Sequence, residues 1–117
     1  MESFRRGAVV KVPFPYMDRA TRQFRPALVV SDARFAAAHG LLWVVMITSA
    51  ENRGWAGDVE VRDLARAGLP VPSVIRTAKI ATIEARDATI LGRVPATLLG
   101  QVDRHLSANL GRAPTAD

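Results

Sequence analysis

The sequence predicts a small, mostly antiparallel β barrel or sandwich decorated with helices. Its length of 117 residues fits one domain, which we expect to span residues 1–117. Short β-branched runs alternate with turn residues along most of the chain, whereas few segments have helical character. Hydrophobic residues make up 49% of the chain, so a core can form without disulfides or metal.

Two strands are predicted near the start of the chain. Residues 7–12 form the first, which ends or bulges at Pro13 and Pro15, because two such close prolines cannot lie in a central ladder. Residues 25–31 form the second strand. Within it, residues 27–30 are apolar without alternation, which predicts burial on both faces.

A short helix and a third strand follow. Residues 32–39 are rich in alanine, and either Ser31 or Asp32 can cap the N-terminus, which predicts a helix. Residues 41–49 form the next strand, a long apolar run in which we expect Trp43 to lie in the core.

The second half of the chain predicts more strands. Residues 58–61 alternate polar and apolar, as expected of a half-buried edge strand. Residues 62–72 contain glycine and prolines and are expected to be mostly irregular. Residues 73–83 form one bent strand or two short ones, and residues 89–94 form a further short strand.

A C-terminal helix is predicted to begin at Pro95 and to stop at Gly111, packed on the sheet. Its apolar residues recur at helical spacing: Leu98, Leu99, Val102, Leu106 and Leu110.

No apolar run is long enough to span a bilayer, and the first residues lack the apolar region of a signal peptide. Together with the absence of cysteine, this fits a cytoplasmic protein.

The net charge of +5 is concentrated early, since residues 1–25 hold six basic and two acidic side chains. This asymmetry suggests a polyanionic partner, either nucleic acid or an acidic protein segment. The excess is modest, however, and for charge alone a role in solubility is the better explanation.

Several common catalytic motifs are missing. The two histidines have no carboxylates at metal-binding spacing, and the glycines match no phosphate-binding loop. We therefore expect no metal and no cofactor. Arginine, lysine, threonine and a few carboxylates remain, and this set can cleave RNA without metal. In that reaction the ribose 2′-OH attacks the adjacent phosphorus, and the protein stabilises the charge that develops.

Arg25 and Thr48 stand at ends of the two most apolar strands, where a guanidinium and a hydroxyl could share one end of the sheet. Arginine binds phosphate with bidentate donation, and a threonine hydroxyl can donate to a phosphoryl oxygen. From residue chemistry alone, a surface salt bridge explains Arg25 better. Thr48 could likewise be only a β-former at a strand end.

Four segments, in this order and spacing, resemble the MazF/PemK family of toxin ribonucleases over roughly residues 5–110. They are Arg5-Arg-Gly with Val-Pro-Phe-Pro-Tyr16, Arg25-Pro-Ala-Leu-Val-Val-Ser31, Ile47-Thr-Ser49 and Ser73-Val-Ile-Arg76. The resemblance implies an SH3-like barrel of the MazF/PemK/CcdB type that works as a homodimer. It also implies that Arg25 and Thr48 are a catalytic pair cleaving single-stranded mRNA to a 2′,3′-cyclic phosphate, and that a small acidic antitoxin occupies the RNA groove.

The roles of other polar residues stay open at this point. Arg76 could contact phosphate or pair with Glu60 or Asp58, and the two alternatives are about equal. Lys79 could add charge to an RNA site or lie on a solvated strand. Family members often carry an acid before the Arg-Pro motif, where this chain offers Asp18, so the general base is not defined.

Further candidate RNA contacts are Arg22, Ser49 and two aromatic residues. Phe24 and Trp55 could stack on unpaired bases, although Trp55 could equally pack against a dimer partner.

Two other functions remain as alternatives. One is a gyrase-poisoning toxin like CcdB, although that family depends on a C-terminal Trp-Gly-Ile and this chain ends Ala-Pro-Thr-Ala-Asp. The other is a barrel that binds nucleic acid or peptide without catalysis.

Overall fold

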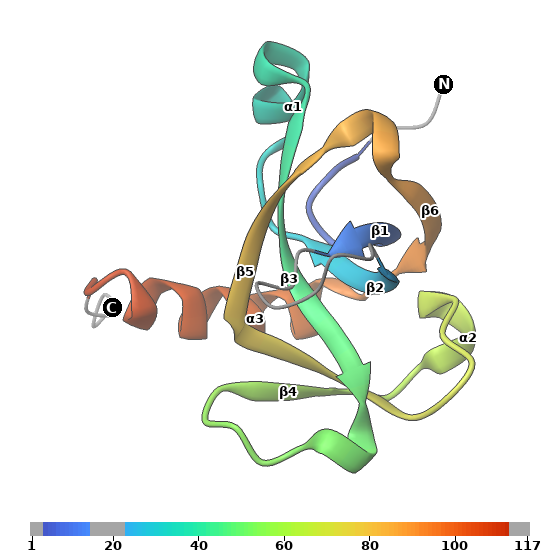
Figure 1. Ribbon diagram of the computed structural model, residues 1–117. Helices are drawn as coiled ribbons and strands as arrows, with labels where there is room; N and C mark the ends of the chain where they lie inside the picture. Colours follow the sequence, from blue (N-terminus) through green and yellow to red (C-terminus); the bar gives the residue numbers. More distant parts are fainter. Residues whose placement is uncertain (1–3, 15–22, 113–117) are drawn as a thin grey trace.

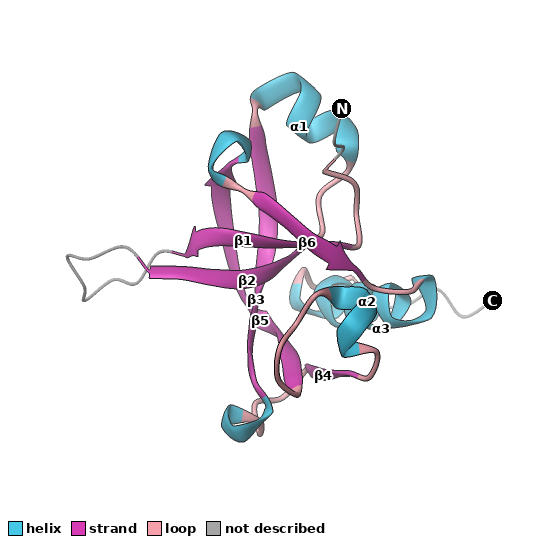
Figure 2. Ribbon diagram, turned by 90° about the vertical axis from the view of Figure 1, so that its right-hand side faces the viewer, coloured by secondary structure: helices cyan, strands magenta, loops and turns pink. Residues whose placement is uncertain are grey.

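The computed structural model describes residues 4–14 and 23–112, whose strands form one curled antiparallel sheet (Figures 1 and 2). The strands are β1 (Ala8–Phe14), β2 (Gln23–Val29), β3 (Leu41–Ser49), β4 (Asp58–Val61), β5 (Ser73–Glu84) and β6 (Thr89–Arg93). They lie in the order β4-β5-β3-β2-β1-β6. The prediction of a mostly-β, SH3-like barrel with helices is confirmed.

The helices are α1 (Ala33–His39), α2 (Leu64–Ala67) and α3 (Ala96–Asn109), and the 3-10 turns are η1 (Ala50–Asn52) and η2 (Ala85–Asp87). Helix α1 projects from one end of the barrel (Figures 1 and 2), whereas α2 and α3 contribute side chains to the same core on one face of the sheet. No helix in the described part of the chain is long and apolar enough to cross a membrane.

The sheet has a hydrophobic core on each face, because successive side chains of a strand point to opposite sides. Along β1, Val9 joins the core beneath the helices, which includes Leu98 and Val102 of α3. Val10 and Val12 join the other core, inside the curl of the sheet. The same division occurs in β2, which confirms that the run at residues 27–30 is buried on both faces.

Strand β5 is the bent strand that the sequence predicted. Its pairing with β3 shifts where Val45 is opposite Ile80 while the next residue, Met46, is opposite Arg76. The extra residues in β5 form a bulge, which bends the strand (Figure 1). The bend lets the first half of β5 pair with β4 and the second half run alongside β3 toward α1.

One sequence prediction, the burial of Trp43, was wrong. Trp43 is not in the core: its side chain is 47% exposed, because the β2–β3 ladder ends at Val44, and the indole packs on Phe35 of α1. Residues 62–72 are mostly irregular, as expected, apart from the one-turn helix α2. Asp63 caps its N-terminus and Gly68 ends it in a left-handed conformation. Helix α1 begins after Asp32, one of the two predicted caps.

Candidate active site

The strand register places Arg25, Thr48 and Arg76 on one face of the sheet. Met46 of β3 is opposite Ala27 of β2 on one side and opposite Arg76 of β5 on the other. Residues that pair across strands share a face, so Ala27, Met46 and Arg76 form one row. Arg25 precedes Ala27 by two residues and Thr48 follows Met46 by two, so both extend that face by one row.

This face is the inner face of the curled sheet, since Ala27 and Met46 belong to the core inside the curl. Arg25 is exposed at its edge, and its guanidinium donates to Oε1 of Gln23 at 3.1 Å. Thr48 is half-buried at the end of β3. The structure therefore brings a cation and a hydroxyl to the same end of one apolar surface, as the sequence predicted.

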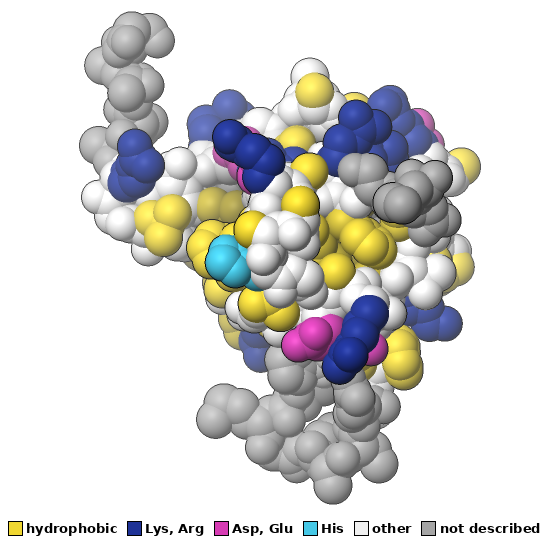
Figure 3. All heavy atoms as spheres, turned by 90° about the horizontal axis from the view of Figure 1, so that it is seen from above, with side chains coloured by type: hydrophobic (Ala, Val, Ile, Leu, Met, Phe, Trp, Pro, Cys, Tyr) yellow, Lys and Arg dark blue, Asp and Glu magenta, His cyan; other side chains and the backbone are white. Residues whose placement is uncertain are grey.

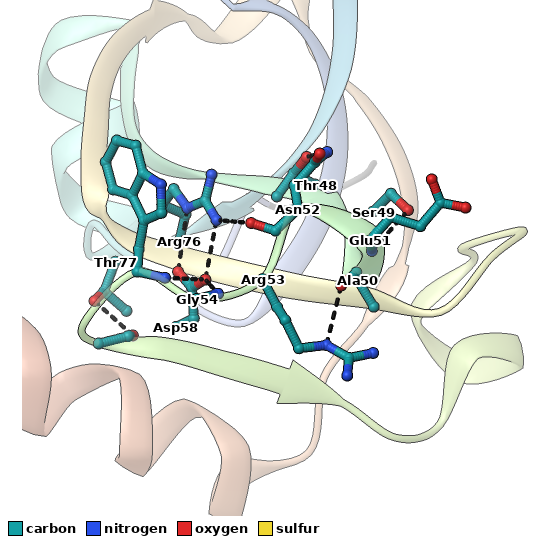
Figure 4. A network of polar contacts seen from close by, with 12 residues as sticks. Thr48, Ser49, Ala50, Glu51, Asn52, Arg53, Gly54, Asp58, Arg76 and Thr77 are labelled. Carbon is teal, nitrogen blue, oxygen red and sulfur yellow. Dashed lines mark hydrogen bonds and ion pairs between the residues drawn. The ribbon is translucent and has the colours of Figure 1, made fainter.

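The Thr48 hydroxyl oxygen accepts a hydrogen bond from the side-chain amide of Asn52, over 3.0 Å (Figure 4). The chain reaches Asn52 through η1, which begins directly after β3. Ser49 caps this turn, because its Oγ accepts from the backbone N–H of Glu51 at 3.3 Å. The alternation of β3 points Ser49 away from Thr48, toward the face that carries Ile47.

Arg76 is buried, with 6% of its surface exposed, and its charge is neutralised within the chain. Its Nε and Nη2 donate to the two carboxylate oxygens of Asp58 at 3.2 and 3.0 Å, and Nη2 also donates to the carbonyl of Asn52 at 2.6 Å (Figure 4). Of the alternatives open from sequence, the structure shows the ion pair with Asp58.

The indole of Trp55 lies over the Arg76 guanidinium, 4.3 Å from Cζ to the ring centroid. Nζ of Lys79 is 5.8 Å from the same ring. Both distances fall in the range of cation–π contact. Trp55 is 48% exposed and Lys79 is exposed, so a flat aromatic surface beside a cation remains open to solvent.

Asp58 carries the main pKa shift of this network. Burial alone would raise the pKa of its carboxyl. The hydrogen bonds and positive charge of Arg76, with the backbone N–H groups of Trp55 and Gly54, outweigh burial and hold the pKa below its usual value. Asp58 is therefore an ionised acceptor at neutral pH and a poor proton acceptor for catalysis.

Residues 5–110 match the family described as PemK-like, MazF-like toxin of type II toxin-antitoxin system. The chain belongs to this family. Toxins of the family are generally endoribonucleases. No curated protein matches the sequence.

Solved structures agree with the family assignment. The toxin resembles a MazF crystal structure from Deinococcus radiodurans with a TM-score of 0.79 and 25% identity, covering 95% of this chain and 99% of that one. A MazE-MazF complex from the same organism gives a TM-score of 0.75 and 25% identity, covering 97% and 100%. An endoribonuclease with its cognate antitoxin from a mycobacterial species shares the fold at 18% identity, with a TM-score of 0.74 and coverage of 98% and 100%.

The other predicted site residues of this toxin do not all join Arg25 and Thr48. Phe24 is 56% exposed, but it neighbours Arg25 on the strand and so points to the opposite face. Arg22 and Asp18 lie outside the described residues. Within the described ranges, no three histidine, aspartate or glutamate side chains are grouped to hold a metal ion.

The sequence analysis missed Asn52. Its contact with Thr48, four residues earlier in the chain, depends on the 3-10 turn η1, which brings the side-chain amide of Asn52 to the Thr48 hydroxyl. The one available signal was Ser49 two residues before Glu51, a spacing typical of a side chain that caps a turn.

Proposed function

We propose that this toxin is a metal-independent, sequence-selective endoribonuclease that cleaves single-stranded mRNA. The observation that carries the proposal is the position of Arg25 and Thr48 on one face, at one end, of the curled sheet. Family membership supports RNA as the substrate. A toxin that cuts mRNA would act in the cytoplasm.

In the proposed reaction the ribose 2′-oxygen attacks phosphorus and the bond from phosphorus to the 5′-oxygen breaks. The 2′-OH loses its proton to a base, and the leaving 5′-oxygen gains one. The products are a 2′,3′-cyclic phosphate and a 5′-hydroxyl. The Arg25 guanidinium stabilises the charge on the phosphoryl oxygens, and the Thr48 hydroxyl donates to one of them and holds the group in line.

The general base is not Asp58, because both of its oxygens accept hydrogen bonds from Arg76 or from backbone N–H groups. Asp18, before the Arg-Pro motif, remains the candidate from sequence order. Trp55 and Lys79 provide a stacking surface and a cation for a neighbouring nucleotide, which suits recognition of an unpaired base.

We also propose that the toxin is a homodimer that binds a cognate acidic antitoxin. A groove of about 700 Å³ runs along α3 and β5 and is lined by exposed apolar side chains, among them Trp43, Ile80 and Leu110. In the view from above, hydrophobic side chains are open at the surface, with clusters of basic side chains and a few acidic ones near them (Figure 3). A second copy would cover the apolar groove, and the net positive charge of the chain suits an acidic peptide. Trp55 packs on Arg76 within the chain and keeps an exposed side that could meet RNA or a second copy.

The test is cleavage of a long single-stranded RNA in excess EDTA, with analysis of the product ends. Wild type should give cyclic phosphate and 5′-hydroxyl ends. Arg25→Ala should remain folded, because the side chain is exposed, and should lose on the order of 100-fold or more in rate. A folded wild type that leaves RNA intact would favour the gyrase-binding or non-catalytic alternatives.

A further inference from the structure

Asn52 is held at two points that connect the buried ion pair to the proposed catalytic hydroxyl. Its backbone carbonyl accepts from Nη2 of Arg76 at 2.6 Å, and its side-chain Nδ2 donates to Oγ1 of Thr48 at 3.0 Å. Arg76 is fixed in turn by the bidentate contact with Asp58, in which both side chains are only 8% exposed. The contacts form one chain from Asp58 to Thr48 (Figure 4).

The rest of the β3–β4 loop is fixed as well. Oδ2 of Asp58 accepts from the backbone N–H groups of Gly54 and Trp55 at 3.3 and 3.2 Å. The buried Thr77 hydroxyl donates to the carbonyl of Gly57 at 2.8 Å. Thr77 also lies so close that a Cβ at Gly57 would be 2.7 Å from its Oγ1. The loop is therefore organised before any substrate binds, and the Asn52 amide is aimed rather than mobile.

The amide controls which way the Thr48 hydroxyl can donate. A hydroxyl has one proton to donate and can accept two hydrogen bonds. Because Nδ2 of Asn52 is a donor, it occupies an acceptor position on Oγ1 and the hydroxyl proton must point elsewhere. The face beyond Thr48 also carries Arg25, so a phosphoryl oxygen bound there would meet both donors.

We propose that Asn52 is a positioning residue that orients the Thr48 hydroxyl as a donor to the scissile phosphate. The inference rests on the proposed function of Thr48. Arg76 supports the same geometry by holding the Asn52 backbone, which explains why an arginine of this site is buried and paired instead of open to phosphate.

The test is the single-turnover cleavage rate at saturating RNA for Asn52→Ala, Thr48→Val and the double variant. Asn52→Ala removes the amide but keeps the carbonyl that Arg76 binds, so the loop stays in place. We expect its rate to fall about three- to tenfold, the usual effect of one hydrogen bond, with RNA affinity unchanged. In the Thr48→Val background the same change should have no further effect, because the hydroxyl is gone.

Asn52→Asp provides a second variant of the same shape. Its carboxylate only accepts, so it would draw the Thr48 proton away from the phosphate and slow cleavage more than alanine does. Ala56→Asp, in the exposed part of the same loop, controls for the added negative charge and should slow cleavage less than Asn52→Asp.

Asn52→Ala cleaving at the wild-type rate, or slowing cleavage equally with and without the Thr48 hydroxyl, would overturn the positioning role while leaving the proposed function standing. Thr48→Val cleaving at the wild-type rate would overturn the proposed function itself, and the role of Asn52 with it. The two failures are therefore distinguishable.

Discussion

Replacing Asp58 with asparagine should destabilise the toxin, because both carboxylate oxygens accept hydrogen bonds and asparagine would replace one of them with an NH₂ donor. Oδ1 accepts from Nε of Arg76, and Oδ2 accepts from Nη2 of Arg76 and from the N–H groups of Gly54 and Trp55. An asparagine NH₂ at either position meets at least one of these donors. Fewer hydrogen bonds are lost if the NH₂ group takes the Oδ1 position, opposite Nε of Arg76.

The expected cost combines one lost charge-assisted hydrogen bond with a buried guanidinium left without its counter-charge. A hydrogen bond to a charged group contributes about 1.5–3 kcal/mol. Removing one partner of a buried ion pair costs about 3–5 kcal/mol, and the asparagine oxygen retains part of the contact. We therefore expect the free energy of unfolding to fall by about 2–4 kcal/mol at pH 7.

The difference between wild type and Asp58→Asn should depend on pH in one direction. The pKa of Asp58 is lowered in the folded protein, so its stabilising effect is complete above the unfolded pKa, which is about 3.9. It is lost as the pH falls through the still lower folded pKa. Urea titrations at pH 7 and at several values below about pH 4 should therefore show the difference shrinking on acidification.

Glu60→Gln is the matched control, since Glu60 lies two residues further along β4 and is exposed. It should change the free energy of unfolding by less than about 0.5 kcal/mol. A loss of that small size for Asp58→Asn, or a difference that grows on acidification, would refute the assignment of Asp58 as the ionised partner of Arg76.

Three further outcomes are expected. Thr48→Val should bind RNA with unchanged affinity and salt slope but cleave it more slowly, measured by fluorescence binding and single-turnover rates. RNA affinity should fall with salt by a log–log slope of about −0.7 per phosphate engaged, and Lys79→Ala should make the slope shallower, whereas an unchanged slope would remove Lys79 from the RNA site. Ile80→Asp, in the apolar groove, should give a monomer by sedimentation if that groove holds the second copy.

The strands were predictable because their signal is local. Burial on both faces leaves apolar runs without alternation in β2 and β3, and the half-exposed edge strand β4 alternates. The order of the Arg-Pro and Ile-Thr-Ser motifs then indicated the family, and the family match extends over residues 5–110. Trp43 shows where local sequence patterns fail to predict burial, since its exposure depends on where the neighbouring strand stops pairing.

The network around Thr48 could not be predicted, because it depends on the path of a loop. Asn52 is four residues from Thr48 in sequence, but its amide reaches the Thr48 hydroxyl only because residues 50–52 form the 3-10 turn η1. Asp58 and Arg76 are separated by 18 residues and meet through the register of β4 and β5. Neither relation produces a periodic pattern.

The two arginines of the site show why charge alone was a weak guide to function. By the chemistry of their side chains alone, both Arg25 and Arg76 can bind phosphate. In the structure, Arg76 is buried with a carboxylate, a carbonyl and an indole around it, so its positive charge is already balanced within the chain. Arg25 is exposed at the edge of the same face, and its guanidinium donates to Oε1 of Gln23. A phosphate approaching this face would therefore reach the exposed Arg25 and not the buried Arg76, whereas removing Arg76 would act through the loop and should lower stability and activity together.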